Sequence, residues 1–419
     1  ELIPSFTTNA IRRRDPRKAT WRDDGIKSDT GADLRWGISQ DVYLNATLNP
    51  DFSQVEADSV QLDTNNTFSL YFPERRTFFL DGADYFNTFE NLVYTRNISN
   101  PNFGVKITGK RNAHSYALLT ANDKKTQFIA PTSLSSSVTT LHNEFGDDLS
   151  SNITIGRYRL DIFKNSSIGA LVTDRRSTNG GINYKNTVKS FDAVLRPTTS
   201  DTITIQTMNS SSNNPLQLQT QSMPRGEQSG NAKRIEYRHV DRVWDWRIGL
   251  DSFSEGFRAD LGFVNRVDYK YFVTTIGRSW RSSGEKFFNR IRFAIDYDRT
   301  ENQAGFELEE ELEFFINMNG PSQSYLNGLF GASKTYWSGQ VYNEQFNQIS
   351  LGFSPKAAFK LGIYLRLEDV VDFRNSGLGR SLRFGPEVRL QLGRHMQINL
   401  DFTQQKFKVA GGQLFETKL

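Results

Sequence analysis

Alternation of apolar and polar side chains, repeated from about Phe103 to Phe407, is the feature that most constrains this chain. In the run 388–392, Val, Leu and Leu alternate with Arg and Gln, and in the run 396–403, Met, Ile, Leu and Phe alternate with Gln, Asn, Asp and Thr. Successive side chains of a strand point to opposite faces, so each run has one apolar and one hydrophilic face. The pattern therefore predicts a succession of strands that are each two-faced.

The connections between these runs alternate between short and long. Short ones are expected near residues 110–113, 165–166, 198–200, 240–242, 282–285, 320–322, 354–356 and 393–394, and long ones near 123–151, 175–187, 209–231, 255–266, 299–303, 340–344 and 375–380. A soluble sandwich shares the alternation, but the systematic difference in loop length favours a barrel in a membrane. We predict an all-β fold, a transmembrane antiparallel up-and-down β-barrel of about 18 to 22 strands with a long internal plug-like segment. By the usual polarity, the short set is periplasmic and the long set extracellular.

Composition agrees with strands rather than helices as the spanning element. Hydrophobic residues make up 37% of the 419 residues and the mean hydropathy is −0.56. No apolar stretch approaches the roughly 20 residues that a membrane-spanning helix needs. A barrel escapes such a test because half of each strand faces a polar interior.

Several function classes receive little support. Cysteine is absent, so there is no disulfide framework, thiolate metal site or cysteine nucleophile. The charge of +4 is a balance of 51 basic and 47 acidic residues with no organised basic cluster, so we expect no nucleic-acid partner. The four histidines form no HExxH pattern, and GxSxG and Walker-type motifs are missing, so the chain is not expected to be an enzyme.

Residues 49–102 interrupt the strand pattern with acids, aromatics and a Pro-Glu-Arg-Arg cluster. A connection this long is usually functional or packed. In a wide barrel it could fold into the lumen, where Arg75 and Arg76 would pair with wall carboxylates. A surface loop with its own small core is the equally weighted alternative. The candidate plug or constriction residues are Asp51, Glu56, Asp58, Glu74, Arg75, Arg76, Asp81 and Asp84.

The same segment offers a weak case for calcium. Asp51, Glu56, Asp58 and Asp63 could supply hard oxygen ligands, but their spacing is not that of an EF-hand. Salt bridges to the two arginines are the simpler account, so no cofactor is predicted.

The strings NPDFSQVEAD and FPERRTFFLDGADYF, within residues 49–86, resemble the hallmark of a bacterial outer-membrane barrel family of unknown function, domain of unknown function 5916. In that family the region usually follows a module similar to family 9 carbohydrate-binding domains, and we do not expect such a module within residues 1–419. The resemblance implies no reaction and no catalytic residues. With it, we divide the chain into N-terminal barrel strands (1–48), a plug or constriction (49–102) and the main wall (103–419), which we expect to continue past Leu419.

Charged residues in two neighbouring runs predict the character of the lumen. Glu307, Glu309, Glu311 and Glu313 share one face of their strand, and Arg290 and Arg292 share a face of the preceding one with Asp296 and Asp298. Such ladders create a field that selects polar or charged solutes, or they only solvate the lumen or bind the plug. Glu310 falls in the apolar register, which a bulge or a position near the headgroups would explain.

Two function classes stay open. The first is a plugged pore or export channel of the bacterial outer membrane for a polar substrate, with glycan-related substrates among the candidates. The second is a non-conducting anchor or platform that binds surface glycans or partner proteins. Either would have the lipid bilayer and lipopolysaccharide as partners, and glycans or other outer-membrane proteins are further candidates.

Overall fold

The computed structural model describes residues 1–14, 21–50, 65–143, 145–178, 181–218, 223–282, 284, 287–409 and 412–418. The expected residues Asp51, Glu56 and Asp58, and the possible calcium ligand Asp63, lie outside these ranges. No helix among the described residues is long and apolar enough to cross a membrane.

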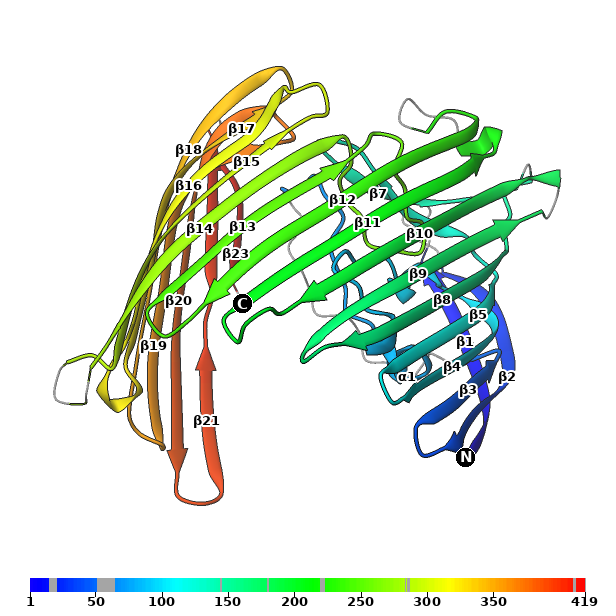
Figure 1. Cartoon of the computed structure of the whole chain (residues 1–419), viewed down its shortest axis with the longest axis horizontal. Coiled ribbons are helices and arrows are strands. Elements are labelled where there is room, and N and C mark those ends of the chain that lie inside the picture. The colour runs from blue at the N-terminus through cyan, green and yellow to red at the C-terminus, as the bar shows by residue number, and fades with distance from the viewer. Residues whose placement is uncertain are drawn as a thin grey trace.

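A single antiparallel sheet of 21 strands makes up most of the molecule (Figure 1). Its strands are β1 (Leu2–Arg14), β2 (Trp21–Ser39), β3 (Val42–Leu48), β4 (Pro101–Arg111), β5 (His114–Asp123), β8 (Ser151–Ile162), β9 (Ser166–Ser177), β10 (Tyr184–Leu195), β11 (Asp201–Asn214), β12 (Gly226–Val240), β13 (Trp244–Phe253), β14 (Tyr269–Arg281), β15 (Arg290–Glu301), β16 (Glu307–Asn319), β17 (Tyr325–Trp337), β18 (Gln340–Lys356), β19 (Phe359–Asp372), β20 (Gly377–Leu392), β21 (Met396–Asp401), β22 (Gln404–Val409) and β23 (Gly412–Lys418). The remaining elements are the hairpin of β6 (Gln127–Pro131) and β7 (Ser136–Thr140) and the short helices α1 (Thr77–Leu80), η1 (Ala83–Phe86), η2 (Thr95–Asn97), η4 (Leu216–Leu218) and η5 (Pro321–Gln323).

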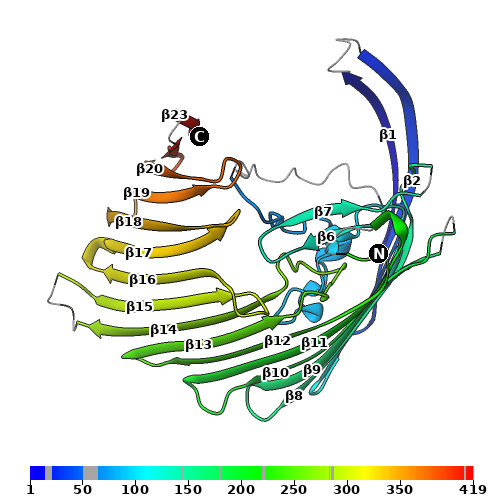
Figure 2. The same cartoon turned by 90° about the horizontal axis from the view of Figure 1, so that it is seen from above.

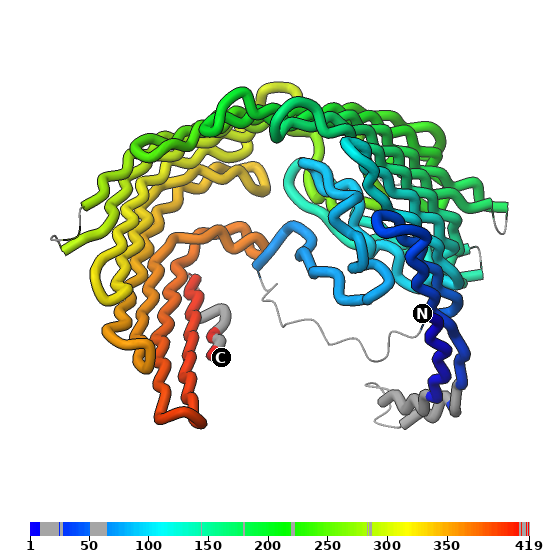
Figure 3. The backbone as a smooth tube through the Cα atoms, turned by 60° about the horizontal axis from the view of Figure 1, so that its bottom comes forward, coloured from blue at the N-terminus to red at the C-terminus, as the bar shows by residue number. Residues whose placement is uncertain are grey.

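Neighbours in the sheet follow the order of the chain. β5 pairs directly with β8, so the β6–β7 hairpin is not part of the large sheet, which we call the wall. β20 pairs with β21 along one part of its length and with β22 along another. The sheet curves into a trough, and in the described residues its edges β1 and β23 do not pair with each other (Figure 3). The predicted all-β, antiparallel, barrel-like architecture is confirmed.

Alternation along the strands gives the wall its two faces. Ile276, Ile295 and Phe314 are direct neighbours on β14, β15 and β16, and all three side chains are exposed on the convex face. One residue away along the same strands, Asp296 lies opposite Glu313 on the concave face. Apolar rows of this kind, continued by β18 and β19, leave large hydrophobic side chains outside the wall, which a water-facing surface would not tolerate at this scale.

Connections at the two ends of the wall differ as expected. One end carries short turns such as residues 112–113 between β4 and β5, whereas the other carries residues 49–100, 124–150, 215–225 and 254–268. Two expected long connections are wrong. Residues 377–380 of the connection expected at 375–380 belong to β20, which follows a short turn at 373–376, and the connection expected at 340–344 lies within β18. The turn there is Ser338–Gly339 with both residues at positive φ, 49° and 85°, and β18 already begins at Gln340.

Candidate functional site

Three long connections enter the concave side of the wall and pack together. We call the described residues of 65–100, 124–150 and 254–268 the inner assembly. Figure 2 shows its hairpin β6–β7 and its short helices inside the curve of the sheet. Since all three come from the end with long connections, the assembly fills the trough from that side.

The inner assembly shares a hydrophobic core with the wall. Phe79, Leu92 and Phe257 are buried against wall residues such as Ile155 and Val188. A second cluster joins Phe128, Leu141 and Leu149 of the β6–β7 region to Tyr184 of β10. The three segments therefore pack against the wall through a shared hydrophobic core. The sequence did not predict that residues 124–150 and 254–268 belong to this packing.

Glu74 and Arg76, two of the candidate plug residues, form a clamp within their own segment. The Arg76 Nε donates to Glu74 Oε1 at 2.8 Å and its Nη2 donates to Glu74 Oε2 at 2.6 Å. The guanidinium also donates to the carbonyls of Thr95 and Ile98 at 2.7 and 2.6 Å, closing the segment into a loop. Burial alone would raise the pKa of Glu74, but the bonds to Arg76 outweigh it and hold that pKa below its usual range. The expected pairing of Arg76 with a wall carboxylate is thus replaced by a partner two residues away.

Asp81 attaches the same segment to the first strands of the wall. Its Oδ2 accepts a hydrogen bond from Asn45 Nδ2 of β3 at 2.5 Å and lies 3.4 Å from Arg35 Nε of β2. Lys106 of β4 donates to the backbone carbonyl of Phe78 at 2.5 Å and to that of Asp81. By contrast, the side chain of Asp84, in η1, is exposed.

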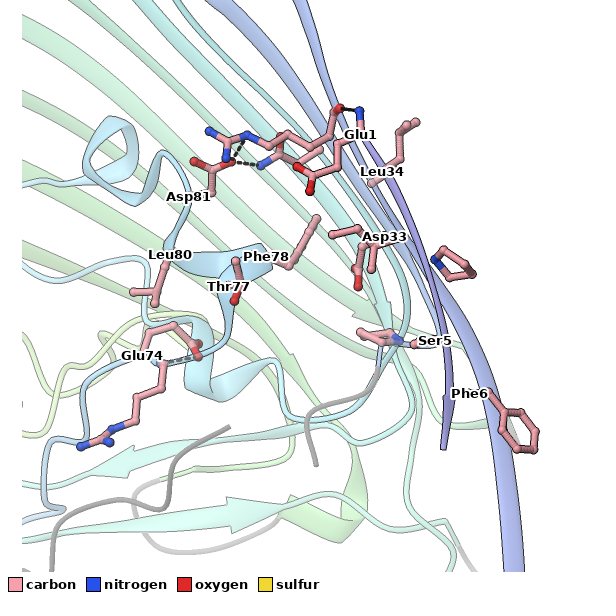
Figure 4. A pocket seen from close by; sticks show the side chains of 17 residues that line it. Glu1, Ser5, Phe6, Asp33, Leu34, Glu74, Thr77, Phe78, Leu80 and Asp81 are labelled. Carbon is pink, nitrogen blue, oxygen red and sulfur yellow. Dashed lines mark hydrogen bonds and ion pairs between the residues drawn. The ribbon is translucent and has the colours of Figure 1, made fainter. Parts of the chain in front are cut away.

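A cavity of about 1140 Å³ lies between this segment and β1–β3, and Figure 4 shows its lining. Glu74, Thr77 and Leu80 approach it from the inner assembly, and Asp33 approaches from β2. Arg75, the remaining candidate of this segment, also lines it. With charges of both signs on its walls, the cavity is suited to water or a polar solute.

Arg175 of β9 is a buried attachment point that the sequence analysis missed. Its Nη2 lies 2.9 Å from Asp123 Oδ2, and neither side chain is exposed. The same guanidinium donates to the carbonyls of Asn97, Gln127 and Lys125 at 2.7 to 3.1 Å. One wall arginine therefore holds two of the three inserted segments.

Two further arginines complete the attachment. Arg258 donates to Asp260 Oδ1 at 2.7 Å within the third segment and to Asn214 Oδ1 of β11 at 2.7 Å. Arg234 of β12 pairs with Glu90 of the inner assembly and, at 2.9 Å, with Asp251 of β13. Burial raises the pKa of Glu90 in spite of Arg234.

The charged ladder lies on the open part of the concave face. Asp298 stands opposite Glu311, and Asp296 opposite Glu313, so carboxylates face carboxylates across β15 and β16. Glu309 continues the row and pairs with Arg266 of the inner assembly at 2.8 Å. Directly opposed like charges are destabilising, so the fold retains this patch at a cost.

Glu307 does not continue that row. A register shift between Thr300 and Glu301 aligns Glu307 with Glu301 on the convex face, where it lies 3.2 Å from Arg299. Glu310, on the convex face as the pattern predicted, is paired with Lys334 of β17 at 2.6 Å. The register shift lies at Leu308 and Glu310 keeps its regular position opposite Arg299, so the pairing with Lys334, and not a bulge, accounts for this charge.

Arg290 and Arg292 lie nearer the short turns than the carboxylate patch. They stand opposite Asn319 and Asn317 rather than opposite glutamates. Arg292 pairs with Asp245 of β13, and Arg290 donates to Ser279 Oγ at 3.2 Å. The basic pair and the acidic patch thus occupy different levels of the same face.

Among the described residues, no group of three or more histidine, aspartate or glutamate side chains is arranged to hold a metal ion.

Residues 2–138 match the family described as a domain of unknown function, DUF5916. This confirms the resemblance carried by the two strings in residues 49–86, while the placement after a carbohydrate-binding module is not shown. Comparison with curated proteins returned no match.

Solved structures with a similar course of the chain come from Pseudomonas and include a BenF-like porin. OccK10 (OpdN) of Pseudomonas aeruginosa is 8% identical over 76% of this chain and 91% of its own, with a TM-score of 0.41. OccK2 (OpdF) of the same species is 9% identical over 75% and 87%, with a TM-score of 0.40. A BenF-like porin of Pseudomonas fluorescens Pf-5 is 9% identical over 100% and 95%, with a TM-score of 0.37. The likeness is loose.

Proposed function

We propose that this chain forms the wall of a bacterial outer-membrane channel whose lumen is narrowed by the inner assembly and which passes polar solutes. The observation that carries the proposal is that single strands have an apolar face and a charged face. On β15 and β16, Ile295 and Phe314 face outward while Asp296 and Glu313 face the trough. An apolar outer surface with a charged interior is the arrangement that lipid outside and water inside require.

The unbalanced carboxylates favour cations as the preferred solutes. Asp296, Asp298, Glu311 and Glu313 share one patch, and the described residues place no ion pair on any of them. Carboxylates that line a pore lower the energy of a passing cation and raise that of an anion. We therefore propose cation preference at this level of the lumen.

A sealed platform is the second candidate, and the buried arginines favour it. Opening the trough would break the ion pair of Arg234 with Glu90 and the buried hydrogen bonds that Arg175 and Arg258 form between the wall and the inner assembly. In this version the wall anchors loops that meet glycans or other proteins. Lipopolysaccharide, glycans and protein partners are predictions in both versions.

Planar-bilayer recording separates the two. A channel gives unitary currents, and under a salt gradient the reversal potential has the sign of cation preference. If the protein is a sealed platform, we expect no unitary currents from the unmodified protein or from a variant whose inner assembly has been loosened. Currents with anion preference would overturn the solute assignment while leaving the channel in place.

A further inference from the structure

A shallow groove crosses the convex face of β12 to β15 near the long connections. Its volume is about 510 Å³. We call it the outer groove, and the lining residues on the convex face are Lys233, Ile235, Leu250, Ser252, Lys270, Phe272, Tyr297, Arg299 and Glu301. It lies on the opposite side of the wall from the lumen and takes no part in the channel described above.

The floor of the outer groove is an apolar row. Ile235 stands opposite Leu250, and Leu250 opposite Phe272, so three large side chains are direct neighbours on adjacent strands. All three are exposed, with Leu250 at 53% of its full accessibility. Such a row offers a surface for acyl chains.

The rim of the outer groove is cationic. Two residues along the same strands toward the long connections, Lys233 stands opposite Ser252, and Ser252 opposite Lys270. Both lysines are exposed, and among the described residues neither has a carboxylate within ion-pair distance. The Lys270 Nζ donates only to the carbonyl of Gln303, at 3.0 Å. Two ammonium groups thus border one side of the floor.

On β15, Glu301 stands opposite Lys270 at the level of the rim, and Arg299 stands opposite Phe272 at the level of the floor. Arg299 Nη2 lies 2.7 Å from Glu301 Oε1 and 3.2 Å from Glu307 Oε2, so this arginine is already neutralised. The excess positive charge of the outer groove therefore rests on Lys233 and Lys270. An incoming anion would meet these two first.

On β12 to β14, the two lysines lie at a different height in the wall from the apolar row, as the headgroup and acyl chains of a lipid do. Lys270 is the second residue of β14 and Phe272 the fourth, so the cations lie about 7 Å nearer the strand ends than the floor. An ion at the level of the headgroups above an apolar row at the level of the acyl chains complements an anionic lipid.

We propose that the outer groove binds a phosphorylated lipid of the leaflet on the long-connection side, a lipid A phosphate of lipopolysaccharide. The phosphate lies between Lys233 and Lys270, and an acyl chain packs along Ile235, Leu250 and Phe272. This inference rests on the proposed membrane location of the wall, but not on whether the lumen conducts.

The test measures lipid retention by the detergent-solubilised full protein in native mass spectrometry. Three probes are added separately: hexa-acylated lipid A carrying both phosphates, the same lipid after chemical removal of the phosphates, and inorganic phosphate. The unmodified protein is expected to retain the phosphorylated lipid, and the dephosphorylated lipid and free phosphate at least about tenfold more weakly.

The paired variant is Lys233→Gln with Lys270→Gln, and the matched control is Lys334→Gln. Lys334 is also an exposed lysine on the convex face but pairs with Glu310 outside the outer groove. The double variant is expected to lose about tenfold in retention of the phosphorylated lipid, while the control keeps it. Equal retention by all three proteins, or equal retention of both lipids, overturns the proposal.

Two further readouts keep these outcomes interpretable. Far-ultraviolet circular dichroism and resistance of the folded band to unfolding in detergent verify that the double variant is folded. Single-channel currents are recorded in bilayers free of phosphorylated glycolipid, so failure of the channel proposal leaves the lipid result standing, and the reverse.

Discussion

Arg175 and Asp123 form a salt bridge of 2.9 Å that is completely shielded from solvent, at the point where the inner assembly meets the wall. Asp123 also accepts hydrogen bonds from the backbone nitrogens of Ser99 and Asn100 at 3.1 and 2.8 Å. The pair therefore joins β5, β9 and the end of the first segment of the inner assembly, at residues 99–100. Removal of one partner would strand the other charge in a dry site.

Replacing Arg175 by Met is expected to loosen the inner assembly. Breaking a buried pair by removing one partner typically costs about 3 to 5 kcal/mol, because the remaining charge is uncompensated. If the wall conducts, unitary currents in planar bilayers should become larger or noisier, and limited proteolysis should cut residues 124–150 sooner.

Arg176→Met supplies the control for that experiment. Arg176 is adjacent, lies on the opposite face of β9 and is bonded to Asp174, with its side chain 59% exposed. Its loss is expected to change stability by less than about 1 kcal/mol. If both variants behave alike, the buried pair is not what holds the assembly.

Neutralising the carboxylate patch should alter ion selectivity. The double variant Asp298→Asn with Glu311→Gln removes two negative charges that face each other on the concave side. We expect the cation-to-anion permeability ratio to fall by a factor of about 2 to 10. Reversal potentials under a salt gradient measure it, and Glu310→Gln on the convex face of the same strand should leave the ratio unchanged.

Alternation was sufficient to predict the wall because it depends on each strand alone. The outward positions of Ile295 and Phe314 follow directly from period two. Glu307 departs from it because the register shift beside Leu308 adds one residue, and a bulge leaves no mark in an alternating sequence.

The attachments of the inner assembly could not be predicted, since they join residues far apart in the chain. Period two places Arg175 on the concave face, but the carbonyls of Asn97 and Gln127 become its partners only once two connections have folded inward. Arg76 shows the opposite case. Its partner Glu74 was visible in the same cluster, and a local carboxylate competes well with any distant one.

Acidification should weaken the clamp of Glu74 and Arg76. Because the folded-state pKa of Glu74 is below its ordinary value of 4.5, the clamp's contribution is complete above about pH 4.5 and is lost as pH falls through the folded pKa. The difference in unfolding free energy between the unmodified protein and Glu74→Gln, from denaturant titrations at several pH values, should shrink on acidification.

The contribution of Glu90 to stability should change with pH in the opposite direction, since burial raises the pKa of Glu90 despite Arg234. Its folded state holds the proton more tightly than the unfolded chain, so its contribution falls as pH rises above about 4.5. The same titrations on Glu90→Gln should therefore give a difference that changes in the other direction. Parallel pH trends for the two variants would contradict these assignments.

Gly230 of β12 is a point of close approach between the third inserted segment and the wall. A Cβ there would lie 2.1 Å from the backbone nitrogen of Phe257 and 2.3 Å from its Cα, atoms that cannot move aside without shifting the segment. Gly230→Ala is expected to lower the free energy of unfolding by about 1 to 3 kcal/mol and to speed amide exchange in residues 254–268.

Gly156→Ala is the control, because nothing lies within 4 Å of its added Cβ. In a strand with free space, alanine is expected to be neutral or slightly stabilising. Equal exchange rates in the two variants would show that the close approach at Gly230 does not hold the segment against the wall.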